Sequence, residues 1–245
     1  MKAESAAYVA KIREIISRIE TEEKASIAEG ARMLARSIES GGLIHVFGTG
    51  HSHIFAEEAF FRAGGLACIN PVLEPSLMLH TGAVKSSVLE NQSGFAKAVF
   101  EHFDPQPPDS LVLFSNSGVN AVPVEFALLA RARGIPTIGI GSKRYITYLK
   151  QEKGKQSITE FCDVFIDNKG EVGDASVEVE ALGEKIGPTS TIAGVLILQL
   201  LLIETVSELV EKQVIPPIFV SGNLPGGKEK NRELIQRYRK LVRML

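Results

Sequence analysis

The fold is decided by two stretches of similar design, Leu43–His53 (LIHVFGTGHSH) and Leu111–Asn120 (LVLFSNSGVN). Each begins with a short apolar run, which is typical of a buried strand, and continues into a loop of glycine and small polar residues. Glycine lets the backbone turn sharply and approach a ligand, and a following helix offers free N–H groups to an anion. The two stretches therefore predict a pair of phosphate-binding loops, whose candidate residues are Gly50, Ser52, Ser115, Asn116, Ser117, Gly118 and Asn120.

Neither loop has the signature of a nucleotide site. Gly48-Thr49-Gly50 matches only the first half of a dinucleotide fingerprint, and neither loop ends in the Gly-Lys-Ser/Thr of a nucleotide P-loop. We therefore expect no NAD or ATP and no other cofactor. Taken alone, either loop could be an ordinary strand-to-helix turn rich in small residues. Two such loops in one chain favour the ligand site.

A third segment, Gly187–Thr191, precedes the apolar stretch Ile192–Ile203. Its hydroxyl residues are suited to cap a helix, with Pro188 as a break before the first turn. The N–H groups at a helix start are equally able to bind a ligand anion. The sequence thus adds three phosphate-binding candidates, for which capping is the alternative role: Thr189, Ser190 and Thr191.

Composition favours one globular domain over residues 1–245, with an N-terminal helical segment (1–40) and a C-terminal loop–helix tail (216–245). The chain has 245 residues, of which 44% are hydrophobic, so it has enough apolar residues for one substantial core. Its 27 basic and 29 acidic residues give a net charge of −2. The chain therefore has no overall positive charge that would favour nucleic acid or an anionic membrane. Any anion site must come from a local group of residues.

Two further features favour a cytoplasmic protein. Cys68 and Cys162, the only cysteines, lie beside apolar residues and are expected to be reduced and buried. The first residues show no signal-peptide pattern. The apolar run Ile192–Ile203 is about twelve residues long, too short for a bilayer, and is expected to form a helix in the core or at a subunit contact.

The order of apolar segments predicts an open parallel α/β sheet with helices on both faces. Helical spacing of apolar residues covers about residues 4–40, as one long helix or two shorter ones. Strand-like and helix-like segments then alternate, which implies parallel pairing through right-handed crossovers. The expected strands are 43–47, 66–70, 111–114, 136–141 and 164–167; the expected helices lie around 57–61, 95–103 and 122–133, with a basic helix ending at Arg243.

Three of these motifs together resemble the SIS (sugar isomerase) domain family: Gly48-Thr49-Gly50-His51-Ser52, Ser115-Asn116-Ser117-Gly118 and Pro188-Thr189-Ser190-Thr191. The stretch Glu57–Gly65 is similar to SIS proteins that carry the name phosphoheptose isomerase. The resemblance spans about residues 5–215. It implies a three-layer sandwich with a five-stranded parallel sheet flanked by helices, a homodimer or homotetramer, and a sugar-phosphate site near the subunit interface.

The resemblance also implies roles for individual residues. Ser52, Ser115 and Ser117 would hold the phosphate, with backbone help from Gly118 and Asn116, while Asn120 stands where the family commonly has Ser or Thr. Phosphoheptose isomerases place a glutamate after the first loop and a histidine on the late helix. Here Glu57-Glu58 resembles the glutamate segment about one turn closer to Ser52, and residues 192–211 contain no histidine.

The catalytic candidates are therefore Glu58, Glu184 and His51. Adjacent residues of a helix point about 100° apart, so one of Glu57 and Glu58 is expected to face the site, and Glu58 is chosen. Each candidate has an ordinary structural alternative: a solvated or salt-bridged glutamate, or a loop histidine bound to a carbonyl. His51 and His53 lack the neighbouring carboxylates or cysteines of a zinc site, so no metal is expected.

Two functions of different classes follow. The first is an aldose–ketose sugar-phosphate isomerase of carbohydrate metabolism, or a lyase (etherase) acting on an amino-sugar phosphate, in which a carboxylate or histidine moves a proton beside the carbonyl. The second is a non-catalytic sugar-phosphate sensor. Regulators of this family usually carry a DNA-binding domain, and the roughly 40 residues before the first strand are too few for one.

Overall fold

A five-stranded parallel sheet forms the centre of the molecule in the computed structural model, which describes residues 1–245 apart from the side chain of Lys153. The strand order is β2 (Ile69–Val72), β1 (Ile44–Gly48), β3 (Ser110–Phe114), β4 (Thr137–Gly141), β5 (Val164–Asp167). Every residue of the first four strands is buried, as expected for a parallel sheet covered on both faces. The predicted α/β architecture is confirmed.

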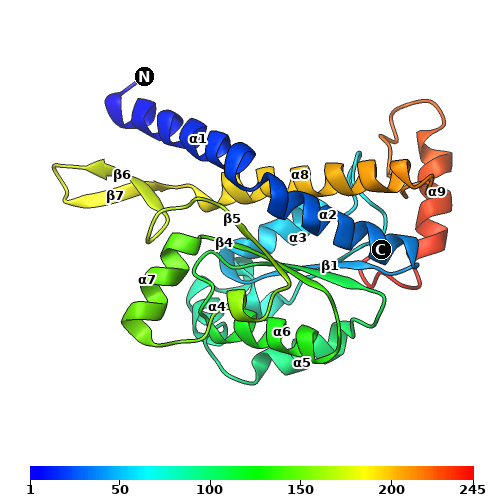
Figure 1. The fold of residues 1–245 in the computed structure, drawn as a ribbon, viewed down its shortest axis with the longest axis horizontal. Helices are drawn as coiled ribbons and strands as arrows, with labels where there is room; N and C mark the ends of the chain where they lie inside the picture. Colours follow the sequence, from blue (N-terminus) through cyan, green and yellow to red (C-terminus); the bar gives the residue numbers. More distant parts are fainter.

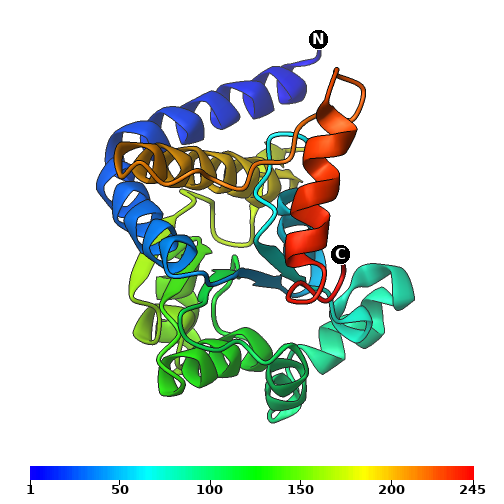
Figure 2. The ribbon, with the colours of Figure 1, turned by 90° about the vertical axis from the view of Figure 1, so that its right-hand side faces the viewer.

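Two layers of helices cover the sheet (Figure 1; Figure 2). One layer packs on the larger apolar cluster: α1 (Ala3–Glu22), α2 (Lys24–Glu39), α3 (Ile54–Ala59), α8 (Ser190–Glu211) and α9 (Gly227–Tyr238). The other layer lies on the opposite face: α4 (Ala83–Leu89), α5 (Phe95–Phe103), α6 (Ala121–Ala132) and α7 (Lys143–Lys153). Single 3₁₀ turns cover Gly50–His53, Pro75–Leu77, Leu79–Thr81 and Ile158–Glu160.

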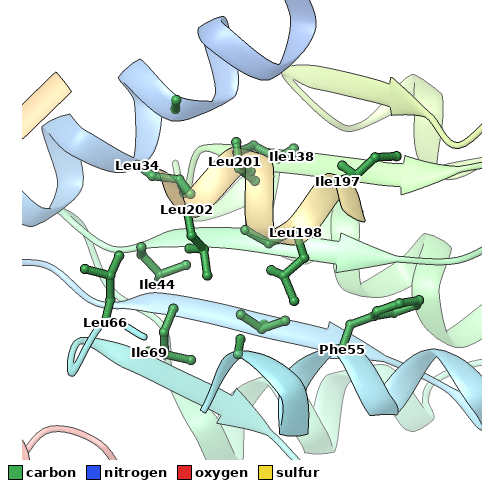
Figure 3. Close-up of a cluster of buried hydrophobic side chains, with 14 of the residues drawn as sticks. Leu34, Ile44, Phe55, Leu66, Ile69, Ile138, Ile197, Leu198, Leu201 and Leu202 are labelled. Carbon is green, nitrogen blue, oxygen red and sulfur yellow. The ribbon is translucent and has the colours of Figure 1, made fainter. Parts of the chain in front are cut away.

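Helix α8 is a core helix with one exposed side. It is long and apolar enough to cross a membrane by length and composition, but its inner residues Ile197, Leu198 and Leu201 are fully buried against the sheet (Figure 3). A Cβ on Gly30 of α2 would lie 3.0 Å from Leu201 Cδ1, so glycine permits the close approach of α2. The outer residues Ile192, Ile203 and Val210 are 42–59% exposed.

Several predicted boundaries differ from the structure. The N-terminal segment is two helices that meet at Glu23, which is one of the two predicted arrangements, but α9 ends at Tyr238 instead of Arg243. The second strand begins at Ile69, three residues later than predicted from Leu66. The helix expected to reach Phe61 ends at Ala59, because Phe60 is extended and Phe61 has a positive φ.

Three features were not predicted: α4, α7 and an antiparallel hairpin of β6 (Ala175–Val179) and β7 (Glu184–Pro188). The hairpin packs mainly against α1 and projects with it from the body of the molecule (Figure 1). β6 is mostly half-buried and β7 is largely exposed, so the apolar pattern of a fully buried strand is absent from their sequence. Pro188 ends β7, and α8 begins two residues later at Ser190, so Pro188 precedes the first turn of the helix as predicted.

Candidate functional site

The loops after β1 and β3 meet at the carboxyl edge of the sheet, on neighbouring strands. The chain leaves β1 toward β2 on one side and returns to β3 on the other, so this is a topological switch point, where ligands of open α/β sheets bind. A cavity of about 300 Å³ lies there. It is lined by both loops, by residues of α4 and the turn before it, and by Tyr145 of α7.

The loop after β1 depends on glycine for its shape. A Cβ on Gly48 would lie 2.3 Å from the carbonyl oxygen of Ser52, so no other residue lets the chain fold back this closely. Gly50 has a φ of +55° and lines the cavity, as do His51 and Ser52. Thr49 Oγ1 donates a hydrogen bond of 2.8 Å to Glu90 Oε2, which ties this loop to the end of α4.

The loop after β3 places Ser115, Asn116, Ser117 and Asn120 at the cavity. Ser115 Oγ accepts a 3.1 Å hydrogen bond from the N–H of Gly118, so that N–H is used inside the loop. Gly118 has a φ of +63°, and a Cβ there would lie 2.5 Å from Ile146 Cδ1. Asn120, the residue directly before α6, lines the cavity.

The loops after β4 and β5 hold the Ser115–Asn120 loop in place. A Cβ on Gly141 would lie 2.2 Å from the Ser115 carbonyl oxygen, so the two backbones touch directly. The N–H of Ser142 donates to the Asn116 carbonyl at 3.1 Å, and Ser142 Oγ donates to the Gly170 carbonyl at 2.7 Å. Three successive loops are thus interlocked behind the cavity.

The third predicted segment, Gly187–Thr191, lies outside this cavity, and its helix start is already bound by a carboxylate of the same chain. The carboxylate of Asp174 accepts from the N–H groups of Thr189 and Ser190, at 3.0 and 2.9 Å, and from Ser190 Oγ at 2.5 Å. Asp174 has a φ of +70° and lies directly before β6. Thr189 is fully buried and Thr191 is half-buried. Thr189, Ser190 and Thr191 are not among the described residues that line the cavity.

The structure brings only one of the three catalytic candidates to the cavity. His51 lines it, at an exposed position. Glu58 forms an ion pair with Arg62 and accepts a 3.1 Å hydrogen bond from Gln199 Nε2 on α8. Glu184 lies at the exposed start of β7 on the projecting hairpin. Neither glutamate is among the described residues around the cavity.

Sequence reasoning missed the α4 side of the cavity, which includes Glu90, Ser86 and Ser87. Glu90 directly follows α4 and is half-buried. Its carboxylate accepts a hydrogen bond from Thr49, and its backbone carbonyl accepts one from the N–H of Val122 at 3.0 Å. Residues 71–109 carry no strong periodicity, and α4 is only seven residues long. No local signal therefore distinguishes Glu90 from a solvated glutamate.

Thiol and metal chemistry have little support in the described part of the chain. Burial raises the pKa of the Cys68 and Cys162 thiols to about 12, so both are protonated at neutral pH. Among the described side chains, no group of three or more His, Cys, Asp or Glu residues is arranged to hold a metal ion.

Comparison with known proteins agrees with this geometry. The SIS domain model matches residues 7–142, which include both loops and the α4 wall of the cavity. The chain belongs to the SIS domain family. This SIS domain is 38% identical to a UPF0309 protein of Thermoanaerobacter pseudethanolicus, over 97% of this chain and 98% of the relative. It is also 38% identical to a UPF0309 protein of Geobacillus thermodenitrificans, covering 97% and 96% of the two chains.

Solved structures show the same fold. The SIS domain superposes on a phosphoheptose isomerase from Francisella tularensis with a TM-score of 0.56 and 14% identity, covering 84% of this chain and 98% of that one. The phosphoheptose isomerase of Neisseria gonorrhoeae gives a TM-score of 0.54 and 16% identity, covering 83% and 96%. At this identity the likeness concerns the fold alone.

Proposed function

We propose that this SIS domain binds a sugar phosphate in the cavity between the loops after β1 and β3. Ser52 and Ser117 would donate their hydroxyls to the phosphate, with Gly50, Asn116 and Asn120 beside them and with Ser115 and Gly118 fixing the loop. The convergence of two glycine-containing, hydroxyl-rich loops at the switch point supports the proposal. Thr189, Ser190 and Thr191 act in this proposal as the capped start of α8.

The proposed reaction is interconversion of an aldose and a ketose phosphate. It requires a group that moves a proton between neighbouring carbons. His51 and Glu90 are the acid/base candidates that line the cavity, and Glu90 is held in position by Thr49. Glu58 and Glu184 remain predictions, since each would need a rearrangement or a second subunit to reach this cavity.

A second candidate is a lyase that acts on an amino-sugar phosphate. The same carboxylate would remove a proton beside the carbonyl, and the leaving group would depart from the next carbon. A third is a sensor, in which the cavity binds the ligand without chemistry. The presence of a fixed carboxylate in the cavity favours an enzyme over the sensor.

We further propose a homodimer or homotetramer, a single domain over residues 1–245 and a cytoplasmic location. The exposed Ile192, Ile203 and Val210 on α8 support the assembly, because exposed apolar residues on a core helix need cover that its own chain does not provide. Light scattering at micromolar concentration should give at least a dimer. A monomer would contradict this part of the proposal.

The function is tested by a panel of pentose, hexose, heptose and amino-sugar phosphates. A ligand that binds the folded state raises the melting temperature with concentration, and calorimetry then gives its affinity. Proton transfer is measured as deuterium incorporation from heavy water into the carbon-bound position of each ligand. Binding with exchange supports the isomerase, release of a substituent supports the lyase, and binding without either supports the sensor.

The base is identified by a matched pair of variants, Glu90→Gln and Glu58→Gln. Glutamine keeps the size and much of the hydrogen bonding but cannot accept the sugar proton. We expect Glu90→Gln to lower turnover by about 100-fold or more while binding survives, and Glu58→Gln to have a much smaller effect. The reverse result would return the role to Glu58. His51→Ala is measured in parallel.

A further inference from the structure

Asn168, directly after β5, is buried behind the cavity and contacts the phosphate-binding loop. Asn168 is only 3% exposed. Asn168 Nδ2 donates to Asn116 Oδ1 at 2.9 Å, and Asn168 Oδ1 accepts from the N–H of Gly170 at 2.9 Å. The Asn168 N–H donates to the Gly141 carbonyl, also at 2.9 Å. Both ends of this side-chain amide are therefore engaged.

These contacts determine which way the side-chain amide of Asn168 points and, through it, which way the side-chain amide of Asn116 points. The oxygen and nitrogen of an asparagine side chain have similar shapes, so their assignment rests on their partners. A backbone N–H only donates, so the atom of Asn168 that faces Gly170 must be the oxygen. Its NH₂ then faces Asn116 and requires an acceptor there, which is Oδ1. The NH₂ of Asn116 is consequently left for the other side, where Asn116 lines the cavity.

The partner that sets this direction is itself held firmly. The Gly170 carbonyl accepts a 2.7 Å hydrogen bond from Ser142 Oγ, and a Cβ on Gly170 would lie 2.9 Å from Asn168 Oδ1. Any other residue at position 170 would therefore press on the amide oxygen of Asn168. If both amides were reversed, the NH₂ of Asn168 would face the N–H of Gly170, and two donors would meet without an acceptor.

We propose that Asn168 is a positioning residue, which turns the NH₂ of Asn116 toward the ligand and so makes the cavity select an anion. The proposal rests on the proposed sugar-phosphate site. A donor at this position stabilises a phosphate through a charge-assisted hydrogen bond, whereas the amide oxygen in its place would repel it. Specificity for a phosphorylated over a neutral sugar thus depends on a residue that touches no ligand.

The test is a double-mutant cycle read as the dissociation constant of inorganic phosphate. Asn116→Ala removes the donor and should weaken binding about 10-fold. Asn168→Asp keeps the acceptor for Gly170 but has no proton for Asn116, whose amide should rotate, donate its NH₂ to the new carboxylate and turn its oxygen to the phosphate. We expect this variant to bind about 100-fold more weakly than the wild type.

The double variant separates positioning from the added charge. If Asn168 acts through Asn116, then Asn168→Asp with Asn116→Ala binds phosphate at least as tightly as Asn168→Asp alone, because the misdirected oxygen is gone. If the new charge acts alone, the two losses multiply, and the inference is overturned. A wild type that binds neither phosphate nor any sugar phosphate overturns the proposed function instead.

A second measurement needs no change at Asn168. In the wild type, the side-chain NH₂ signals of Asn116, assigned by their loss in Asn116→Ala, should shift as phosphate is titrated in an amide NMR experiment. The backbone signals of Ser117 and Val119 report that phosphate is bound. Movement of the backbone signals without the Asn116 side-chain signals would contradict the inference even if Asn168→Asp fails to fold.

Discussion

Two helix starts in this protein look alike in sequence and differ in what they face. The loop Ser115–Asn120 leads into α6, and the segment Thr189–Thr191 leads into α8; both are rich in hydroxyls and follow a strand. The first opens on the cavity. The second is filled by the carboxylate of Asp174. A hydroxyl-rich helix start thus indicates a need for an acceptor, but its sequence does not say whether the acceptor is a ligand or the chain itself.

The two regions also differ in how they are held. The loop before α6 is supported from behind by the loops after β4 and β5, which leaves its cavity side free. The acceptor at the start of α8 is Asp174, in the turn before the β6–β7 hairpin. This one contact caps the helix and also fixes the hairpin to it. In the proposed function the first helix start binds the ligand and the second serves stability, and substitutions should separate the two roles.

The largest effect is expected from Gly118→Ala. The residue would be held at a positive φ with its Cβ 2.5 Å from Ile146 Cδ1, so the loop must shift. We expect sugar-phosphate binding to fall about 100-fold or more and the free energy of unfolding to drop by about 1–3 kcal/mol. Calorimetry and urea unfolding measure the two effects.

Gly134→Ala is the matched control. This glycine also has a positive φ, of +73°, but a Cβ there meets nothing within 4 Å, and Gly134 is not among the described residues that line the cavity. It should lose about 1 kcal/mol of stability from backbone strain and keep its affinity. Equal loss of affinity in both variants would show that the binding loop is sensitive to stability alone.

The next effect compares Ser117→Ala with Ser190→Ala. Ser117→Ala should weaken sugar-phosphate binding by about 1.5–3 kcal/mol with little change in stability, because it removes a charge-assisted hydrogen bond made only with ligand. Ser190→Ala should keep the affinity and lose about 1 kcal/mol of stability, because it removes part of a helix cap. Affinity loss at Ser190 would reverse the assignment of the two regions.

The sequence predicts the central strands of this molecule but not the contacts between residues that are far apart in the chain. The strands β1, β3 and β4 are short, mostly apolar segments buried on both faces of a parallel sheet, so their positions and the meeting of the two loops were predictable. The hairpin has no apolar run, and Glu90 lies in a stretch without periodicity. The roles of Asp174 and Asn168 depend on residues 15 and 52 positions away, and no local pattern contains that information.

The smallest effect on binding is expected from Asp174→Ala. The variant leaves the N–H groups of Thr189 and Ser190 without their carboxylate, and should lower the free energy of unfolding by about 1–2 kcal/mol. Affinity for a sugar phosphate should stay within about twofold of the wild type. If phosphate stabilises this variant more than the wild type, the start of α8 is a latent anion site, and the contrast between the two regions weakens.

The most direct measurement is a crystal structure of the protein grown with a sugar phosphate that the binding panel selects. We predict the phosphate between the two loops, within hydrogen-bonding distance of Ser117 Oγ and Ser52 Oγ, with Asp174 still bound to Thr189 and Ser190. A phosphate bound at Thr189–Thr191 with Asp174 displaced, and an empty cavity at the switch point, would contradict the account.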